Sequence, residues 1–197
     1  MSSGGSPETR IQILEAARAI FEEFGYYDAG LGAVAKKAGV SRQAIYLHFE
    51  SKAALLTALH LHIYATDVVP ALERHAITDA ESALEALDAL IAVDVEVVSK
   101  VWRIHEALQI ARRQHPEVEE TLRPREEARY GELLDLGRRL KRERALPPNI
   151  RVGTFADVLW GLVSVGTYRS LVIERGWSLN QYRRWVRSTI RLQIGAD

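Results

Sequence analysis

The chain of 197 residues contains no cysteine. This absence excludes a disulfide framework, a thiolate metal site and a cysteine nucleophile, and it is consistent with a reducing compartment. Long apolar runs are also scarce. The longest uncharged apolar stretch of the second half, residues 158–168, is far shorter than the about 20 residues that a membrane-spanning helix needs. The first six residues lack a basic region followed by an apolar core, so we expect no secretory signal. We therefore expect a cytoplasmic protein without membrane contact.

An excess of charge of one sign is missing as well, because 26 Lys and Arg residues balance 26 Asp and Glu residues. A net charge of zero argues against a nucleic-acid partner, but the distribution matters more than the total. Residues 30–52 contain four basic residues and one acid. This modest local excess is compatible with a DNA-binding segment.

The apolar residues that are present recur at helical spacing, and strand-like alternation is scarce. Ser6 and Pro7 are typical of a helix start, and Gly25 is a natural stop. The stripe expected to be buried in between consists of Ile13, Leu14, Ala17, Ile20, Phe21 and Phe24. We therefore predict an all-α fold of about nine helices.

Further helices are expected along the rest of the chain. Three would cover residues 31–38, a segment capped by Ser41 and a segment capped by Ser51 that runs toward Pro70. The second half would hold five longer helices: one opened by Thr78 or Asp79, one over 99–114, one from Pro116 to about 143 that Pro124 restarts or kinks, one over 151–174 and one from Ser178 to about 194. Pro147, Pro148 and Asn149 mark the clearest linker.

The pair of short helices joined by Ala38-Gly39-Val40-Ser41 has the pattern of a helix-turn-helix. Gly39 can adopt the left-handed conformation of a tight turn, and Ser41 can accept hydrogen bonds from the next amides. If Ile45 and Phe49 point inward, the opposite face is free to enter the major groove. We expect that face, with its cap and the next helix start, to bind DNA through Ser41, Arg42, Gln43, Ala44, Tyr46, Leu47, His48 and Lys52.

These residue types suit different parts of the duplex. An arginine such as Arg42 fits guanine and a glutamine such as Gln43 fits adenine, whereas Ala44 and Leu47 suit a thymine methyl. Tyr46, His48 and Lys52 are expected to contact phosphates, although Tyr46 could instead serve mainly in packing.

The stretch from Val34 to Leu56 resembles the signature of the TetR family of bacterial repressors, in which the turn glycine, cap serine, Tyr46, Phe49 and Lys52 lie at the family spacing. The resemblance covers about the first 60 residues. It implies a homodimer of helical subunits, a ligand pocket in the second domain and release from DNA on ligand binding. It also implies that the last two helices of each subunit form a four-helix bundle at the dimer interface. One departure is visible, because Gly30 stands where the family usually has a capping threonine, and Gly32 follows two residues later.

The second half offers candidates for a small-molecule site. Trp160, Ser164 and Tyr168 recur every four residues, Trp102 and His105 share a helix face, and Tyr130 lies on the helix with Pro124. An apolar wall with a few polar groups is typical of ligand sites, but ordinary core packing explains the same pattern. Four arginines of the last helix, Arg183, Arg184, Arg187 and Arg191, are expected to form a solvated face with salt bridges.

Metal and catalytic sites are not expected. His60 and His62 are two residues apart and diverge on a helix, and residues 161–166 lack the glycine that a nucleophile elbow needs. We predict a helix-turn-helix domain at residues 7–60 and a ligand-binding and dimerisation domain at 61–197, without cofactor or catalytic residues. The partners would be double-stranded operator DNA, a small-molecule effector and a second copy of the chain. An enzyme or carrier that uses the second domain, and a helical protein-binding adaptor, are the alternatives.

Overall fold

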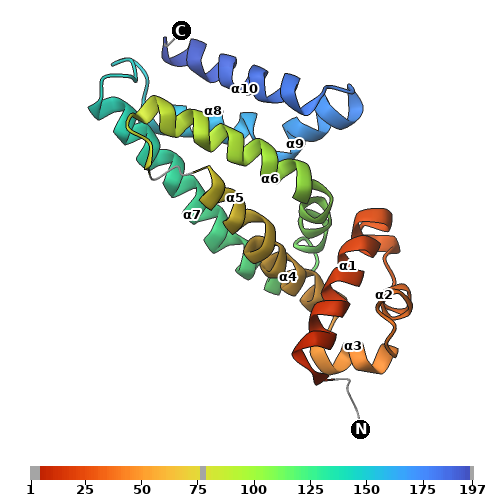
Figure 1. The fold of residues 1–197 in the computed structure, drawn as a ribbon. Helices are drawn as coiled ribbons and strands as arrows, with labels where there is room; N and C mark the ends of the chain where they lie inside the picture. The colour runs from red at the N-terminus through yellow and green to blue at the C-terminus, as the bar shows by residue number, and fades with distance from the viewer. Residues whose placement is uncertain (1–4, 76–78, 196–197) are drawn as a thin grey trace. The chain divides into compact units, whose positions relative to one another are not determined.

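A computed structural model describes residues 5–75 and 79–195. In these two ranges the chain forms nine continuous helices and no strand, which confirms the predicted all-α class (Figure 1). The segments are α1 (Pro7–Asp28), α2 (Leu31–Ala38), α3 (Arg42–His48), α4 (Lys52–Ile63), η2 (Tyr64–Val68), α5 (Val69–Arg74), α6 (Ala83–Ala111), α7 (Pro116–Arg142), α8 (Val152–Leu162), α9 (Val165–Tyr168), η4 (Arg169–Glu174) and α10 (Leu179–Ile194). The segments α4, η2 and α5 follow one another without a break, as do α9 and η4.

The chain divides into two compact units. Unit 1 consists of Met1–Thr66 and Arg103–Arg123, and unit 2 consists of Asp67–Trp102 and Pro124–Asp197. The domain boundary that we expect near residue 60 stays a prediction.

Unit 1 is organised around α1, which packs on α2 and α4. Ser6 caps α1 by accepting a hydrogen bond from the amide of Thr9, as the sequence predicts. The predicted stripe is buried except for Phe24, which is 46% exposed. Gly25 adopts a φ of 69°, which kinks the chain directly after Phe24.

Unit 2 has its own core, formed by α6, α7, α8 and α10. The buried side chains of α10 are Tyr182, Val186, Ile190 and Ile194, which recur every four residues along one face. A capping box between Ser178 and Gln181 starts this helix, and Gly195 ends it with a φ of 65°. The predicted start of the last helix is therefore confirmed.

Two boundaries in the second half differ from the prediction. Helix α6 is continuous from Ala83 to Ala111, where we expected separate helices before and after residue 99. The side chain of Ser82 accepts a hydrogen bond from the amide of Glu85 at 3.2 Å, so the cap lies after Asp79. The alternative cap, Thr78, lies outside the described residues. Helix α7 likewise runs through Pro124 without restarting.

The stretch expected as one helix over 151–174 is interrupted. Helix α8 ends at Leu162, and Ser164 adopts an extended conformation with a ψ of 153°. The side chain of Ser164 then caps α9 by accepting a hydrogen bond from the amide of Thr167 at 3.2 Å. Apolar periodicity did not reveal this break, because both helices contribute apolar residues to the same core.

One helical stretch, Lys52–Arg74, has a mean hydropathy of 1.3 over its most apolar part. By length and composition alone it could cross a membrane, whereas the scarcity of long apolar runs led us to expect no membrane contact. Core helices meet the same criterion, and Leu55, Leu56, Leu59 and Ile63 of this stretch are buried.

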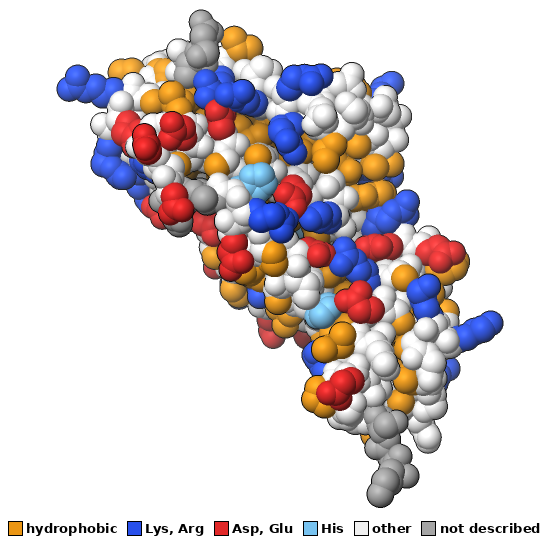
Figure 2. Space-filling model, in the orientation of Figure 1, with side chains coloured by type: hydrophobic (Ala, Val, Ile, Leu, Met, Phe, Trp, Pro, Cys, Tyr) orange, Lys and Arg blue, Asp and Glu red, His pale blue; other side chains and the backbone are white. Residues whose placement is uncertain are grey.

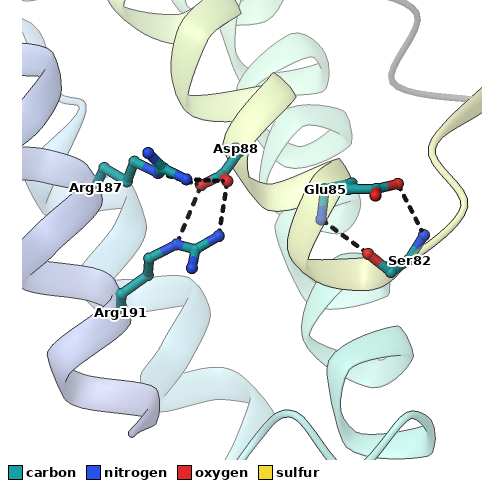
Figure 3. A network of polar contacts seen from close by, with 5 residues as sticks. All are labelled: Ser82, Glu85, Asp88, Arg187 and Arg191. Carbon is teal, nitrogen blue, oxygen red and sulfur yellow. Dashed lines mark hydrogen bonds and ion pairs between the residues drawn. The ribbon is translucent and has the colours of Figure 1, made fainter. Parts of the chain in front are cut away.

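An ion-pair cluster joins α6 to α10 within unit 2. Figure 3 shows the guanidinium groups of Arg187 and Arg191 on the carboxylate of Asp88, with nitrogen–oxygen distances of 2.8 and 2.7 Å to Oδ2. Two of the four arginines of the last helix thus form the predicted salt bridges. On the face seen in Figure 2, basic and acidic side chains alternate over unit 2 without a large patch of one sign.

Candidate nucleic-acid interface

Helices α2 and α3 form a helix-turn-helix in unit 1. Gly39 ends α2 in a left-handed conformation with a φ of 68°, and its amide donates back to the carbonyls of Ala35 and Lys36. The side chain of Ser41 accepts a hydrogen bond from the amide of Ala44 at 3.1 Å and starts α3. Both residues therefore adopt the conformations that the sequence predicts for the turn.

The orientation of α3 follows from its buried residues. Ile45 is fully buried and Phe49 is 4% exposed, so this side faces the interior of unit 1. Tyr46 and Leu47 remain 46% and 69% exposed, and Arg42 and Gln43 are exposed beside them. The guanidinium carbon of Arg42 lies 5.9 Å from the centre of the Tyr46 ring. Four predicted DNA-binding side chains thus share one solvent-facing surface.

Two residues expected on this surface are placed differently. Ala44 is only 8% exposed, because it lies on the side of α3 that includes Ile45. His48 is half-buried, and its Nε2 atom is buried without a hydrogen-bond partner. We therefore correct the expectation that these two side chains face outward to the duplex.

Lys52 begins α4 directly after the cap residue Ser51, whose side chain accepts from the amide of Ala54 at 3.0 Å. Its Nζ atom donates to the carbonyl oxygen of Tyr27 at 3.1 Å and lies 4.7 Å from the centre of the Tyr26 ring. Partial burial lowers the pKa of Lys52, and the charge of Asp28 opposes this effect. Lys52 thus contacts the segment after the kink in α1, and it also lies at the start of α4.

Sequence reasoning missed Tyr26 and Tyr27 as neighbours of Lys52. The two tyrosines follow the kink at Gly25 and precede Lys52 by about 25 residues, so no local pattern links them. It also missed Arg10, whose guanidinium carbon lies 5.1 Å from the centre of the Phe49 ring. Arg10 is an exposed cation that the fold of α1 brings to the end of α3.

The candidates for the ligand site do not form one group. In unit 2 the rings of Trp102 and Tyr168 lie 6.4 Å apart, and Tyr168 also meets the buried ring of Tyr182 at 5.7 Å. A second pair consists of Tyr130 and Trp160, whose rings meet edge to face at 6.0 Å. The hydroxyl of Tyr130 donates to the carboxylate of Asp157 at 2.7 Å, which raises the pKa of Tyr130.

The remaining two candidates have other local partners. His105 belongs to unit 1 and forms a hydrogen bond with Gln109 at 3.1 Å. Ser164 is the cap of α9, so it does not share one continuous helix face with Trp160 and Tyr168. The four-residue spacing was misleading because the helix is broken between Trp160 and Tyr168.

Comparison with known proteins agrees with this geometry. Residues 13–59 match the family described as bacterial regulatory proteins, tetR family. The HTH-type transcriptional regulator UidR of Escherichia coli strain K12 is 37% identical over 103 residues, which cover 50% of this chain and 44% of UidR. The chain thus aligns with less than half the length of that relative.

Two further similarities extend over nearly the whole chain. The HTH-type transcriptional regulator BetI of Proteus mirabilis is 26% identical over 191 residues, which cover 93% of this chain and 90% of BetI. A transcriptional regulator from Saccharomonospora viridis, whose crystal structure contains choline, has a TM-score of 0.79 at 19% identity and covers 94% of this chain and 96% of its own. The structural similarity establishes the fold of both units.

The exposed face of α3 lies on a helix-turn-helix domain that is followed by further helices, an arrangement shared with the fold of the transcriptional regulators named above. Over residues 13–59 the chain is similar to the TetR family of bacterial regulatory proteins.

Proposed function

We propose that the chain is a homodimeric transcriptional regulator that binds operator DNA through α3 and is released by a small molecule. The observation that carries this proposal is the solvent-facing surface of α3, on which Arg42, Gln43, Tyr46 and Leu47 are exposed together. Arginine and glutamine read base edges in the major groove, and an exposed leucine suits a thymine methyl. Such a combination has no evident role in packing.

Phosphate contacts would surround this base-reading surface. Lys52 and the backbone amides at the start of α4 follow closely after the end of α3, and Ser41 and Tyr46 supply hydroxyl groups. Phosphate contacts fix the register of a protein on the duplex, whereas base contacts select the sequence. The proposed site therefore consists of Ser41, Arg42, Gln43, Tyr46, Leu47 and Lys52.

The effector would bind in unit 2, where the pairs Trp102–Tyr168 and Tyr130–Trp160 supply aromatic surface. The regulator from Saccharomonospora viridis binds choline in its crystal structure, which supports a small-molecule effector for this chain without identifying it. A ligand releases DNA only if it binds the two states of the protein with different affinity. Mass spectrometry of small molecules that co-purify with the protein would identify candidates for a release assay.

An enzyme or carrier is the competing class. The relatives described above are transcriptional regulators, and we propose that this chain acts in the cytoplasm by binding and without catalysis. Fluorescence anisotropy with DNA that flanks its own gene separates the classes. A regulator gives salt-sensitive, sequence-selective binding at or below micromolar protein, whereas an enzyme or an adaptor gives none.

Two substitutions test the roles on this surface. Arg42→Ala should weaken binding to the correct site by about 1–3 kcal/mol and relax the preference at one base position. Lys52→Ala should weaken binding to all sequences alike. It should also reduce the slope of log affinity against log salt by about 0.9 for each phosphate that the protein no longer neutralises.

The matched control is Arg138→Ala, which removes an exposed arginine of unit 2 that pairs with Asp135. Its affinity for DNA should equal that of the parent. If Arg42→Ala and Lys52→Ala also bind every sequence as the parent does, α3 is not the DNA-binding surface.

A further inference from the structure

The ammonium group of Lys52 has two partners on the short segment after the kink in α1. One is the carbonyl oxygen of Tyr27, which accepts a hydrogen bond from Nζ at 3.1 Å. The other is the face of the Tyr26 ring, whose centre lies 4.7 Å from Nζ, well within the range of a cation–π contact. Because an ammonium group has three donors, these partners leave a further N–H for an external acceptor.

Tyr26 is itself held on several sides within unit 1. Its ring stacks on Phe21 with centroids 6.4 Å apart and planes 9° from parallel, and it meets the ring of His115 edge on at 6.0 Å. Only 6% of Tyr26 is exposed, although it carries a phenol. The left-handed conformation of Gly25 turns the chain so that this ring points inward beside the start of α4.

We infer that Tyr26 is a positioning residue that holds the ammonium group of Lys52 in place for a DNA phosphate. This inference rests on the proposed function, because it assigns a role in DNA binding to Lys52. A lysine on a flexible four-carbon stem loses rotamer freedom when it binds a phosphate. A lysine that is already held by a ring and a carbonyl has lost part of that freedom before DNA arrives, so its contact contributes more to affinity.

The turn between α6 and α7 lies next to the contact between Tyr26 and Lys52. His115 lies in that turn, and its ring lies 6.0 Å from the Tyr26 ring at an angle of 74°, while Nζ of Lys52 lies over the Tyr26 ring. Both contacts are present together in the structure. Tyr26 is thus the side chain that joins residues 103–123 of unit 1 to the first residue of α4.

A double-mutant cycle on the full-length protein tests the inference. Tyr26→Leu, Tyr26→Phe, Lys52→Met and the double variant Tyr26→Leu/Lys52→Met are compared by anisotropy on the same DNA at one salt concentration. Tyr26→Leu should raise the Kd for DNA about two- to fivefold for each copy of the contact. This fold-change corresponds to the free energy of an exposed cation–π contact. Tyr26→Phe keeps the ring and should restore most of the parent affinity.

In the Lys52→Met background, Tyr26→Leu should have no further effect, because the group that it positions is gone. Phe24→Leu is the matched control, since it removes a neighbouring aromatic ring that is 46% exposed, and its affinity should equal that of the parent. If Tyr26→Leu weakens binding equally in both backgrounds, Tyr26 acts only through packing. If Tyr26→Phe weakens binding as much as Tyr26→Leu, the hydroxyl and not the ring face is responsible. Either result overturns the inference.

A readout without DNA separates this inference from the proposed function. In the NMR spectrum of the parent, the Cε protons of Lys52 should be shifted upfield by the Tyr26 ring, and this shift should disappear in Tyr26→Leu. A parent without the shift overturns the arrangement itself. A parent that shows the shift but binds no DNA overturns the proposed function, and with it the role of Tyr26.

Discussion

A largely buried ion pair joins α6 to α7 in unit 2. The guanidinium group of Arg129 pairs with the carboxylate of Asp94, and it also donates to Glu132 at 2.8 Å. Burial raises the pKa of Asp94, because the loss of solvation outweighs the attraction of Arg129. A charge in this position is tolerated only while its partner is present.

Arg129→Met should therefore lower the free energy of unfolding by about 3–5 kcal/mol at pH 7, as measured by urea denaturation. Because the folded-state pKa of Asp94 is raised above its unfolded value, ionisation of Asp94 costs stability as the pH rises through the folded pKa. The cost disappears as the pH falls below the unfolded value. The loss in free energy of unfolding of the variant relative to the parent should thus shrink as the pH falls toward the unfolded pKa of Asp94. A loss that stays the same over this fall in pH would contradict the assigned role of Asp94.

At the scale of the helices, the packing of α7 on α8 depends on a glycine. A Cβ atom added at Gly137 would lie 3.0 Å from Cδ1 of Phe155 and 3.0 Å from Cγ1 of Val152. Phe155 is fully buried, so its ring has little room to move. The same helix contains Gly131, where an added Cβ meets nothing within 4 Å. Close packing on α8 therefore requires a glycine at position 137 but not at position 131.

Alanine at these two positions should have opposite effects on stability. Gly131→Ala should raise the free energy of unfolding by about 0.5–1 kcal/mol, because alanine is the better helix former. Gly137→Ala should lower it by about 1–3 kcal/mol, because the methyl group overpacks the contact with α8. Thermal and urea denaturation of both variants measure the difference. A stabilising Gly137→Ala would show that the two helices can separate without cost.

At the scale of the whole molecule, the proposed function requires two copies of α3. A dimer that reads one face of the duplex places its recognition helices about 34–36 Å apart, one turn of DNA. Light scattering should therefore give twice the chain mass of 22.1 kDa, and titration should give two chains for each near-palindromic operator. A monomer that binds DNA with full affinity would contradict this arrangement.

The spacing of the two half-sites gives a sharper test of the dimer. Insertion of about 5 base pairs between them rotates one half-site to the opposite face of the duplex. The parent should then lose most of its affinity, whereas each half-site alone should bind as weakly as before. Equal affinity for the original and the lengthened operator would show that the two DNA-binding domains act independently.

Many helix starts and the turn of the helix-turn-helix followed from local sequence. Ser6, Ser41, Ser51 and Ser178 cap helices as predicted, and Gly39 adopts its left-handed turn. Cap and turn preferences involve atoms only a few residues apart, so one chain segment contains the whole interaction. The inward placement of Ile45 and Phe49 followed in the same way from helical periodicity.

Only the tertiary structure decided which side chains from distant segments meet. The placement of Lys52 on Tyr26 depends on the kink at Gly25, and the separation of Trp160 from Tyr168 depends on the break before Ser164. Periodicity places residues on a face only while the helix continues. Contacts between segments far apart in sequence depend instead on packing, whose energy is summed over many residues and is not encoded in any single motif.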